Sequence, residues 1–473
     1  MNESITSTTK TFSGSASLAA IGIKLTELKL FEPIAQLVQI AQKTIKDKPS
    51  EKLYDILISM LAGAHGLIEI NTRLRADVAL QRAFGRRRCA EQSVVQDTLN
   101  ASTAENVKQM EHAMNSIYRQ HSQGYQHDYQ LSFQVLDVDM SGLPCGPKAA
   151  FATKGYFAKQ RNRRGRQLGR VLASHYGEVV VDRLFDGKTQ LTRARPPLVL
   201  AAEETLQLDE DKRRQTIVRV DAGGGSLGDV NWLLSRGYLV HGKDYSGKQA
   251  KRLARSVADW YVDPHQPDRQ FGWVTEAAEA YVRPVKRIAV RCRQQDGEFT
   301  YGVLISAASA HNVLVLTGQP LSLLDNPAAV RLSYVIFYDQ RGGGVETSFK
   351  GDKQGLGMSK RSKKRFEAQQ MLMLLGSLAH NVIIWARGWL TVPTLHHYGM
   401  LRMVRDVLHI SGFLVFDAAG QIIQLVLNQA APLAPALVHP LRSLLASTHV
   451  AVNSSERSPR KRQKHPPVGH MPL

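Results

Sequence analysis

A short stretch in the last third of the chain, Tyr338–Lys353 (YDQRGGGVETSFKGDK), places one carboxylate among several cations. If a helix begins at its glycines, Glu346 shares a face with the residues three, four and seven positions later, which are Phe349, Lys350 and Lys353. An acid beside cations suits a metal-bound phosphodiester, because the acid can bind the metal while the lysines bind phosphate. A solvated helix face with ordinary charge pairs is the alternative.

The charge balance of the whole chain indicates a polyanionic partner. Its 473 residues include 61 Lys+Arg and 41 Asp+Glu, which leaves a formal charge of +20 and a pI near 9.9. Such a balance favours nucleic acid over a membrane surface. The three cysteines have no CxxC spacing, so we expect reduced thiols in a cytoplasmic protein. The N-terminus lacks a signal-peptide pattern, and the apolar stretch Met371–Trp385 is short enough to be a core helix.

Sequence texture divides the chain into several regions, and its length suggests two to four domains. Residues 1–125 have apolar side chains near helical spacing and few strand signals, which predicts a helical N-terminal domain. Its basic run Arg86-Arg87-Arg88 suits phosphate contact. The alternative is a packing or dimerisation domain whose arginines are solvated. Residues 396–452 form a mixed apolar C-terminal segment, and we expect the basic tail 453–473 to be disordered.

The region after residue 126 opens with a strand that carries two acids. Phe133–Asp139 is rich in β-forming residues and is ended by the Met-Ser-Gly that follows. Alternation places Asp137 and Asp139 on the same side of this strand. Two acids that point the same way are costly unless they are paired or bound to a cation. Two solvated acids at the end of a surface strand are the alternative.

A glycine-rich stretch, Ile217–Asp229 (IVRVDAGGGSLGD), has more than one interpretation. Residues 223–228 form a G-x-G-x-x-G after a predicted strand, which with Asp244 further on fits a dinucleotide-binding turn. Residues 224–228 also form a G-x-S-x-G, the pattern of a nucleophile elbow. Each motif is weak, because any glycine-rich turn from a strand to a helix satisfies both. Neither interpretation explains the charge of +20.

Cations also cluster in two other places. Residues 154–170 interleave basic and aromatic side chains, a composition that suits a nucleic-acid backbone and its exposed bases. The arginines at its centre are Arg163, Arg164 and Arg166. A hairpin with a solvated face is the alternative. Further on, the segments 286–293, 299–306 and 313–316 predict antiparallel strands, and in the first of them apolar residues alternate with arginines.

These features occur together in one known family. Tyr338-x2-Arg341 and Glu346-x6-Lys353 resemble the Y-x2-R…E-x6-K signature of bacterial insertion-sequence DDE transposases. Four residues separate the arginine from the glutamate, where the family usually has three. Asp139-Met140-Ser141 resembles the D-x-T/S on the first strand of the family's RNase H-like sheet. The acid at the end of the glycine-rich strand, Asp221, resembles the second acid, because a small residue and Gly follow it.

The resemblance implies an α/β fold and a metal-dependent function. We expect an RNase H-like catalytic domain over 126–395, with a β-rich insertion at about 246–335, after a helical domain that binds DNA ends. The protein would be a transposase that cleaves DNA strands at the ends of an insertion sequence and transfers them. Asp139, Asp221 and Glu346 would be catalytic and would hold two Mg²⁺ or Mn²⁺ ions, with Asp137 as the alternative first acid.

The resemblance and the charge pattern together imply the DNA contacts. The expected residues are Tyr338, Arg341, Lys350, Lys353, Arg163, Arg164 and Arg166. The partner would be double-stranded DNA, both the terminal inverted repeats and the target, bound by a homodimer in the bacterial cytoplasm at the nucleoid. Two alternatives remain open: a catalytically inactive RNase H-fold DNA-binding protein, and a nucleotide-dependent enzyme that uses the turn at 223–228.

Overall fold

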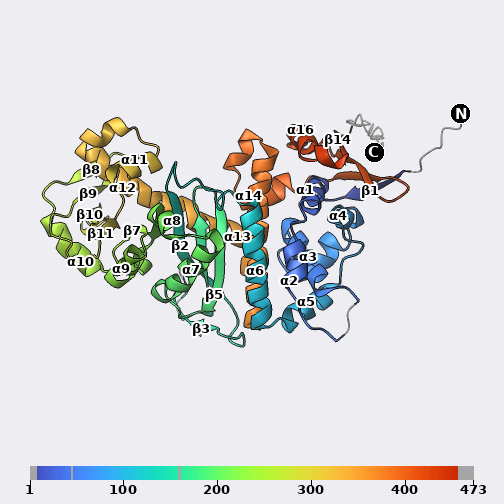
Figure 1. The fold of residues 1–473 in the computed structure, drawn as a ribbon, viewed down its shortest axis with the longest axis horizontal. Helices are drawn as coiled ribbons and strands as arrows, with labels where there is room; N and C mark the ends of the chain where they lie inside the picture. Colours follow the sequence, from blue (N-terminus) through green and yellow to red (C-terminus); the bar gives the residue numbers. More distant parts are fainter. Residues whose placement is uncertain (1–7, 44–45, 158–159, 161, 456–473) are drawn as a thin grey trace, which may run out of the picture.

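A mixed ten-stranded sheet forms the central structural element of the molecule (Figure 1). The computed structural model describes residues 8–43, 46–157, 160 and 162–455. The strand order is β3-β4-β2-β6-β7-β11-β10-β9-β8, and β5 pairs with β4. The strands are β2 (Gln134–Pro144), β3 (Thr153–Lys154), β4 (Arg164–Ala173), β5 (Glu178–Asp186), β6 (Thr216–Val220), β7 (Leu239–Lys243), β8 (Tyr261–Asp263), β9 (Gln266–Trp273), β10 (Lys286–Arg293) and β11 (Phe299–Ser306).

The direction of the strands changes across this sheet. Strands β2, β4 and β5 are antiparallel, whereas β2, β6 and β7 are parallel. Parallel neighbours need a crossover, and helices supply it. Helices α7 (Leu191–Leu206) and α8 (Glu210–Arg214) lie between β5 and β6 in the chain, and α9 (Leu227–Ser235) lies between β6 and β7. Every residue of β6 is buried, as expected for a central parallel strand.

The predicted β-rich insertion extends this sheet instead of forming a separate one. Strands β8–β11 are antiparallel to one another, and β11 pairs with β7. The structure confirms the strands predicted at 286–293 and 299–306. The strand predicted at 313–316 is wrong, because these residues end α11 (Ala310–Leu316), which the Ser309 side chain caps by accepting from Asn312 N. Helices α10 (Gly247–Leu253) and α12 (Pro327–Arg341) complete this region.

The other half of the molecule combines the beginning of the described chain with its end (Figure 1). Its early helices are α1 (Ala16–Glu27), α2 (Glu32–Leu37), α3 (Pro49–Leu61), α4 (Val78–Ala83), α5 (Gln92–Ala101) and α6 (Ala104–His121). A second sheet has the order β1 (Thr9–Ser13), β12 (Gly412–Phe416), β13 (Ile422–Leu427) and β14 (Ala451–Ser454), next to α16 (Ala434–Leu444). The early helices therefore share one apolar core with the C-terminal segment. The disordered tail predicted over 453–473 is wrong at its start, because residues 453 and 454 belong to β14, and residues 456–473 lie outside the described residues.

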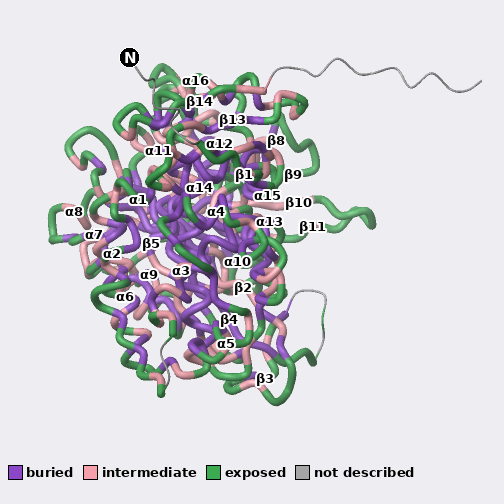
Figure 2. The backbone as a smooth tube through the Cα atoms, turned by 90° about the vertical axis from the view of Figure 1, so that its right-hand side faces the viewer, coloured by how far each residue is buried: buried purple, intermediate pink, exposed green. Residues whose placement is uncertain are grey.

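Helix α14 (Phe366–Leu390) joins the two halves. It lies between the large sheet and the early helices in Figure 1. The Asn381 side chain accepts from Val179 N and donates to Val179 O, which fastens this helix to β5. By length and composition α14 could cross a membrane, but 83% of its most apolar window is buried inside the protein. Figure 2 shows the same distribution, with buried positions concentrated in the centre and the β10–β11 hairpin extending outward.

The basic run in the early helices has an internal role that its sequence did not reveal. Arg86 is buried, and its Nε donates to Asp55 Oδ1 at 2.9 Å and its Nη1 to Glu51 Oε1 at 2.7 Å. Asp55 is fully buried, so this guanidinium neutralises a carboxylate that water cannot reach. The expectation that all three arginines contact phosphate is therefore corrected: Arg86 stabilises the fold, and Arg87 is exposed.

Substitutions of Arg86 and Arg87 distinguish the arginine that stabilises the fold from its exposed neighbour. We expect Arg86→Ala to lower the free energy of unfolding by about 3–5 kcal/mol, because it leaves Asp55 as a buried charge without its partner. Arg87→Ala, one residue away and exposed, should change stability by less than about 0.5 kcal/mol. Urea denaturation of both proteins measures the difference. Equal stabilities would show that the Arg86–Asp55 pair does not support the fold.

Candidate active site

Two of the predicted acids lie side by side where the parallel pairing of β2 and β6 ends. Strand β2 itself continues to Pro144, so the prediction that Met-Ser-Gly ends this strand is wrong. The register of β2 and β6 pairs Val138 with Val220, so the next residues, Asp139 and Asp221, follow at the same level of the sheet. Asp221 begins the short helix η3 (Ala222–Gly224), and its side chain accepts from Gly223 N at 2.9 Å. The carboxyl ends of parallel strands are where α/β sheets place their ligand sites.

The third acid, Glu346, reaches this place from a continuous helical run. Helix α12 ends at Arg341, a π-helical turn η6 (Gly342–Glu346) follows, and α13 (Thr347–Gly355) continues. The glycines thus lie inside a helical run and do not begin a helix. A π turn bonds i to i+5, one residue more than an α turn. It therefore absorbs the extra residue before Glu346 and keeps Arg341 beside it, with Nη1 donating to Oε1 at 2.9 Å.

Arg341 is the centre of the site. Its Nη2 lies 2.9 Å from Asp139 Oδ2, and its side chain is 4% exposed, whereas that of Glu346 is 57% exposed. Burial raises the pKa of Asp139, the charge of Arg341 opposes this, and the negative charges of Asp221 and Glu346 add to the rise, so that the pKa is about 6. The three predicted acids therefore act on one another electrostatically, as members of one site do.

The site fits a divalent cation by its ligand chemistry but not by its present arrangement. Three carboxylates are the hard oxygen ligands that Mg²⁺ prefers. Yet among the described residues no group of three or more His, Cys, Asp or Glu side chains is arranged to hold a metal ion. Arg341 accounts for this, because its guanidinium pairs with both Asp139 and Glu346. In this structure the cation that these two carboxylates contact is the guanidinium of Arg341.

Asp137, the alternative first acid, is committed to the core. It is fully buried, and Arg219 donates to both of its oxygens, Nε to Oδ1 at 2.6 Å and Nη2 to Oδ2 at 2.9 Å. The remaining Nη1 of Arg219 donates to Phe337 O. A bidentate pair of this kind satisfies the carboxylate. Asp139 is therefore the acid of β2 that belongs to the site.

The predicted helix face is only partly present. Phe349 is buried, with the Arg170 guanidinium 4.7 Å from its ring centre, whereas Lys350 is exposed. Lys353 faces β2, where its Nζ donates to Ser141 Oγ at 2.6 Å and to Gly142 O at 2.9 Å. Burial lowers the pKa of Lys353, and the charge of Arg170 adds to this effect. Lys353 thus fastens α13 to the strand that carries Asp139.

Tyr338 lies at the edge of the same site. Burial raises the pKa of its hydroxyl to about 12, partly offset by the charge of Arg341. The charges of Asp221 and Glu346 act on it as well. The structure thus brings Tyr338 and Arg341 together with all three predicted acids. Lys350, by contrast, lies on the outer surface of α13, where it lines a hollow with Arg387 and Arg402.

The three arginines predicted on β4 and in the preceding loop differ in their environments. Arg166 is buried, and it donates to three backbone carbonyls, those of Ala150, Lys363 and Lys364, at 2.8–3.0 Å. Its predicted contact with DNA is therefore corrected, because its guanidinium is committed to the protein backbone. Arg163 and Arg164 are exposed and remain free to meet a ligand through at least part of the guanidinium.

The glycine-rich turn is explained by packing and capping. A Cβ on Gly225 would lie 1.8 Å from Lys243 O, so only glycine permits this close approach to β7. The Ser226 side chain caps α9 by accepting from Asp229 N at 3.3 Å. Asp229 in turn pairs with Arg195 at 2.6 Å. These local roles account for Gly225 and Ser226 without a nucleophile or a dinucleotide, whereas a Cβ on Gly228, the last glycine of both patterns, would meet nothing within 4 Å.

A buried charge network, missed from the sequence, holds the helix that follows Glu346. Arg170 on β4 pairs with Asp182 on β5 at 2.6 Å and with Asp352 on α13 at 2.7 Å. His380 on α14 lies 2.7 Å from the other oxygen of Asp352. Asp352 is three residues after the buried Phe349, so the one available signal was an acid on the buried face of a helix.

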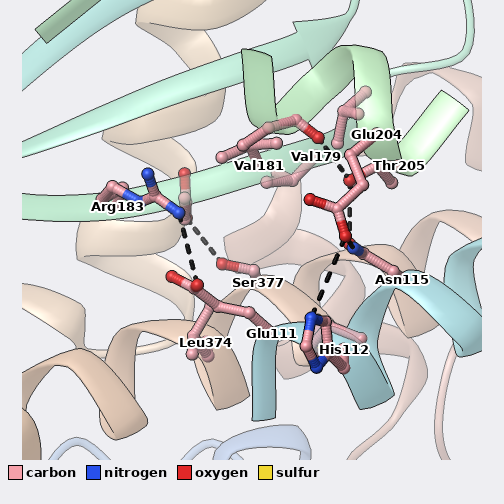
Figure 3. Close-up of a pocket in the computed structure, with 14 residues that line it drawn as sticks. Glu111, His112, Asn115, Val179, Val181, Arg183, Glu204, Thr205, Leu374 and Ser377 are labelled. Carbon is pink, nitrogen blue, oxygen red and sulfur yellow. Dashed lines mark hydrogen bonds and ion pairs between the residues drawn. The ribbon is translucent and has the colours of Figure 1, made fainter. Parts of the chain in front are cut away.

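Another pocket lies between α6, β5, α7 and α14, and Asp182 of the buried network is among the residues that line it (Figure 3). Its polar side chains pair largely with one another: Arg183 with Glu111 at 3.3 Å, and Thr205 Oγ1 with Asn115 Oδ1 at 2.8 Å. None of the site residues predicted from the sequence lines it. The chemistry of the carboxylate site is therefore separate from this pocket.

The buried network yields a prediction about stability and its pH dependence. We expect Asp352→Asn to lower the free energy of unfolding by about 3 kcal/mol at neutral pH, because Arg170 and His380 lose a buried partner. Burial acts to raise the pKa of Asp352, but the charges of His380 and Arg170 outweigh it and lower the pKa. Its stabilising effect is thus present above about pH 4 and is lost as pH falls through its lower folded pKa.

Chemical denaturation between pH 7 and pH 3 measures this contribution. The difference between wild type and Asp352→Asn should shrink as the pH falls. Gln354→Ala, two residues away and exposed, is the matched control. Its free energy of unfolding should follow that of wild type at every pH. A difference that stays constant down to pH 3 would contradict the role of the Asp352 charge.

Comparison with known proteins gives a weak likeness in structure. No protein-family model matches the chain, and no curated protein sequence matches it. Among solved structures, the chain is similar to piggyBac transposase in its synaptic complex with hairpin DNA, determined by cryo-EM. The TM-score is 0.45 at 11% sequence identity, over 89% of this chain and 81% of that chain. A similarity of this size does not establish a shared activity.

Proposed function

We propose that the protein is a DDE transposase of an insertion sequence, with an RNase H-like catalytic domain. The observation that supports this most is the meeting of Asp139, Asp221 and Glu346 around Arg341. The acids come from the first strand, a later parallel strand, and a helix after an insertion, the order that the sequence resemblance implies. An ordinary surface cluster of acids would have no reason to follow that order.

The chemistry that fits these residues is DNA strand cleavage followed by strand transfer. Displacement at phosphorus depends on positioning and on charge stabilisation more than on covalent protein chemistry. The three carboxylates would hold Mg²⁺ or Mn²⁺, which supplies Lewis acidity to a phosphodiester. The protein's own contribution is to position that phosphodiester, with Tyr338 and Arg341 beside the acids and Lys353 holding α13 to β2.

The proposed partner is double-stranded DNA, both the ends of the element and its target. The charge of +20 supports a polyanionic partner. Lys350 lines a hollow beside α13 together with Arg387 and Arg402, so several cations face the same space. Arg163 and Arg164 are exposed at the start of β4. Following the resemblance, two copies of the chain would act on the DNA in a bacterial cytoplasm.

A second candidate function is that of a catalytically inactive DNA-binding protein with the same fold. The observation that favours it is the pair of contacts that Arg341 makes with Asp139 and Glu346, which leaves no arranged metal site among the described residues. The third candidate, a nucleotide-dependent enzyme, has no such support, because Ser226 and Gly225 have local structural roles.

Cleavage of DNA by wild type and Asp221→Asn tests the proposed activity. The substrate is supercoiled plasmid that carries the DNA flanking the gene on both sides. We expect cuts at the element ends in Mg²⁺ and none in EDTA. In Asp221→Asn the rate should fall by at least about a hundredfold to a thousandfold, the usual cost of losing one group that stabilises the transition state. Binding of the same DNA, measured by gel shift, should persist in the variant.

The outcomes distinguish the candidates. Binding by both proteins without any cut would favour the inactive DNA-binding protein. Loss of binding in Asp221→Asn, together with loss of cleavage, would contradict a purely catalytic role for this acid. Glu210→Gln, an exposed acid on α8, is the matched control and should cleave like wild type.

Salt titration of DNA binding tests the proposed contact of Lys350. Each phosphate contact contributes about one unit to the slope of log K against log salt concentration. We expect Lys350→Ala to weaken binding to all DNA sequences several-fold and to reduce that slope by about one. Lys108→Ala removes an exposed lysine on α6 and should leave the slope unchanged. An unchanged slope in Lys350→Ala would place the DNA elsewhere.

A further inference from the structure

Arg341 is paired with two carboxylates and yet has N–H groups without an acceptor, a combination that the proposed activity does not explain. It is 3% exposed, and it pairs with Asp139 and with Glu346 at 2.9 Å each. Even so, its Nε and Nη2 have no hydrogen-bond partner among the described residues, since Nη2 is close to Asp139 but poorly aligned with it. A buried N–H without an acceptor costs free energy, so this guanidinium can gain from a better-placed oxyanion.

The two unpaired N–H groups of Arg341 are buried, so an oxyanion reaches them only if Glu346 moves aside. The side chain of Glu346 is 57% exposed, so the outer side of the ion pair is open to solvent. A guanidinium binds phosphate through two parallel N–H groups, a geometry that neither carboxylate offers it here. The chemical class that fits is therefore a phosphodiester, the group that the proposed function would bring to the carboxylates.

The turn after Arg341 can move at low cost. Gly344 is required by packing, because a Cβ there would lie 2.6 Å from Asp137 Oδ2. Gly342 and Gly343 are different, since a Cβ on either would meet nothing within 4 Å. Glycine inside a helix lowers its stability by about 0.5–1 kcal/mol relative to alanine. Two sterically unnecessary glycines in a π turn therefore weaken the helix beside the arginine.

We propose that Arg341 is an internal counter-ion that exchanges partners when DNA binds. In the DNA-free protein it neutralises Asp139 and Glu346 and keeps divalent cations away from them. When a phosphodiester of bound DNA reaches the site, the guanidinium transfers to it, and the carboxylates become available to a metal ion. The inference rests on the proposed function, and it adds an order of assembly: DNA first, divalent cation second.

Binding of Mn²⁺ to the full chain, followed by electron paramagnetic resonance of the free ion, tests this order without measuring cleavage. We expect weak binding by wild type alone and at least about tenfold tighter binding by Arg341→Gln, because a competing positive charge is removed from the carboxylates. Arg341→Lys keeps the charge and should bind as weakly as wild type. Circular dichroism and thermal melting confirm that each variant is folded.

A matched control is available elsewhere in the fold. Arg269 also pairs with two carboxylates, those of Asp263 and Asp339, outside the proposed site. Arg269→Gln should leave Mn²⁺ affinity unchanged. An equal gain in Arg269→Gln would show that freeing any two acids is enough, and it would overturn the inference.

The DNA-dependent half of the inference uses a short duplex taken from the DNA that flanks the gene. Because DNA itself binds Mn²⁺, each measurement is compared with that of Glu346→Gln on the same duplex. We expect the duplex to tighten Mn²⁺ binding by wild type about tenfold. In the double variant Gly342→Ala/Gly343→Ala, which fits sterically and stiffens the turn, the duplex should have a much smaller effect.

The outcomes separate this inference from the proposed function. If wild type alone binds Mn²⁺ as tightly as Arg341→Gln, Arg341 does not exclude the metal and the inference fails, while the transposase proposal stands. If the duplex fails to tighten binding by a wild type that does bind DNA, the order of assembly is wrong. If no protein binds Mn²⁺ with or without DNA, both the inference and the proposed metal-dependent activity fail.

Discussion

The guanidinium of Arg170 is the interaction on which the architecture of the site depends. It is fully buried, and its pairs with Asp182 and Asp352 connect two strands of the large sheet to α13, the helix that follows Glu346. His380 extends the same network to the central helix α14. Removing charges from water is expensive, and only a complete set of partners offsets that cost. The network therefore tolerates few alternative positions of α13 relative to the sheet.

The position of α13 in turn decides what the carboxylates can do. Lys353 is bonded to Ser141 and Gly142 of β2, two and three residues after Asp139, so the helix and the strand share a second connection. The π turn then sets the angle at which Glu346 meets Arg341. A site assembled from three chain segments needs such rigid supports, because errors of about an ångström reduce catalysis strongly. The support here is ionic, and Arg170 is the register partner of Asp139 across β2 and β4, so the support adjoins a site that is itself ionic.

The sequence predicted the strands and the helix of this site better than the way in which they pack and pair with one another. The strand at Asp139, the strand at Asp221 and the central helix follow from apolar runs and periodicity, and the structure contains all three. The π turn was not predictable from pattern, because three glycines are compatible with a loop as well as with a helix. Phe349 and Lys350 were assigned one face, yet tertiary packing buried the first and exposed the second.

The roles of the arginines were the least predictable feature of the protein, because the composition gives the number of charges but not which charges pair with one another. Arg86, Arg166 and Arg219 all contribute to the charge of +20, yet each is buried against carboxylates or backbone carbonyls. Fewer cations than the sequence contains therefore lie at the surface, where they set the electrostatic potential that a polyanion meets. Which arginines turn inward depends on acids far away in the chain, such as Asp55 for Arg86 and Asp137 for Arg219. No local pattern carries that information.

The pairing of β1 with β12 has a consequence for how this chain is made. Thr9–Ser13 find their strand partners at Gly412–Phe416, about four hundred residues later. During synthesis the first helices emerge with part of their apolar surface uncovered, and the segment that covers it arrives last. Loop closure over such a separation is slow, so the ribosome-bound chain exposes an unpaired strand for most of its synthesis. Cellular abundance of this protein should therefore depend on chaperones that shield its N-terminal half until the C-terminal strands are complete.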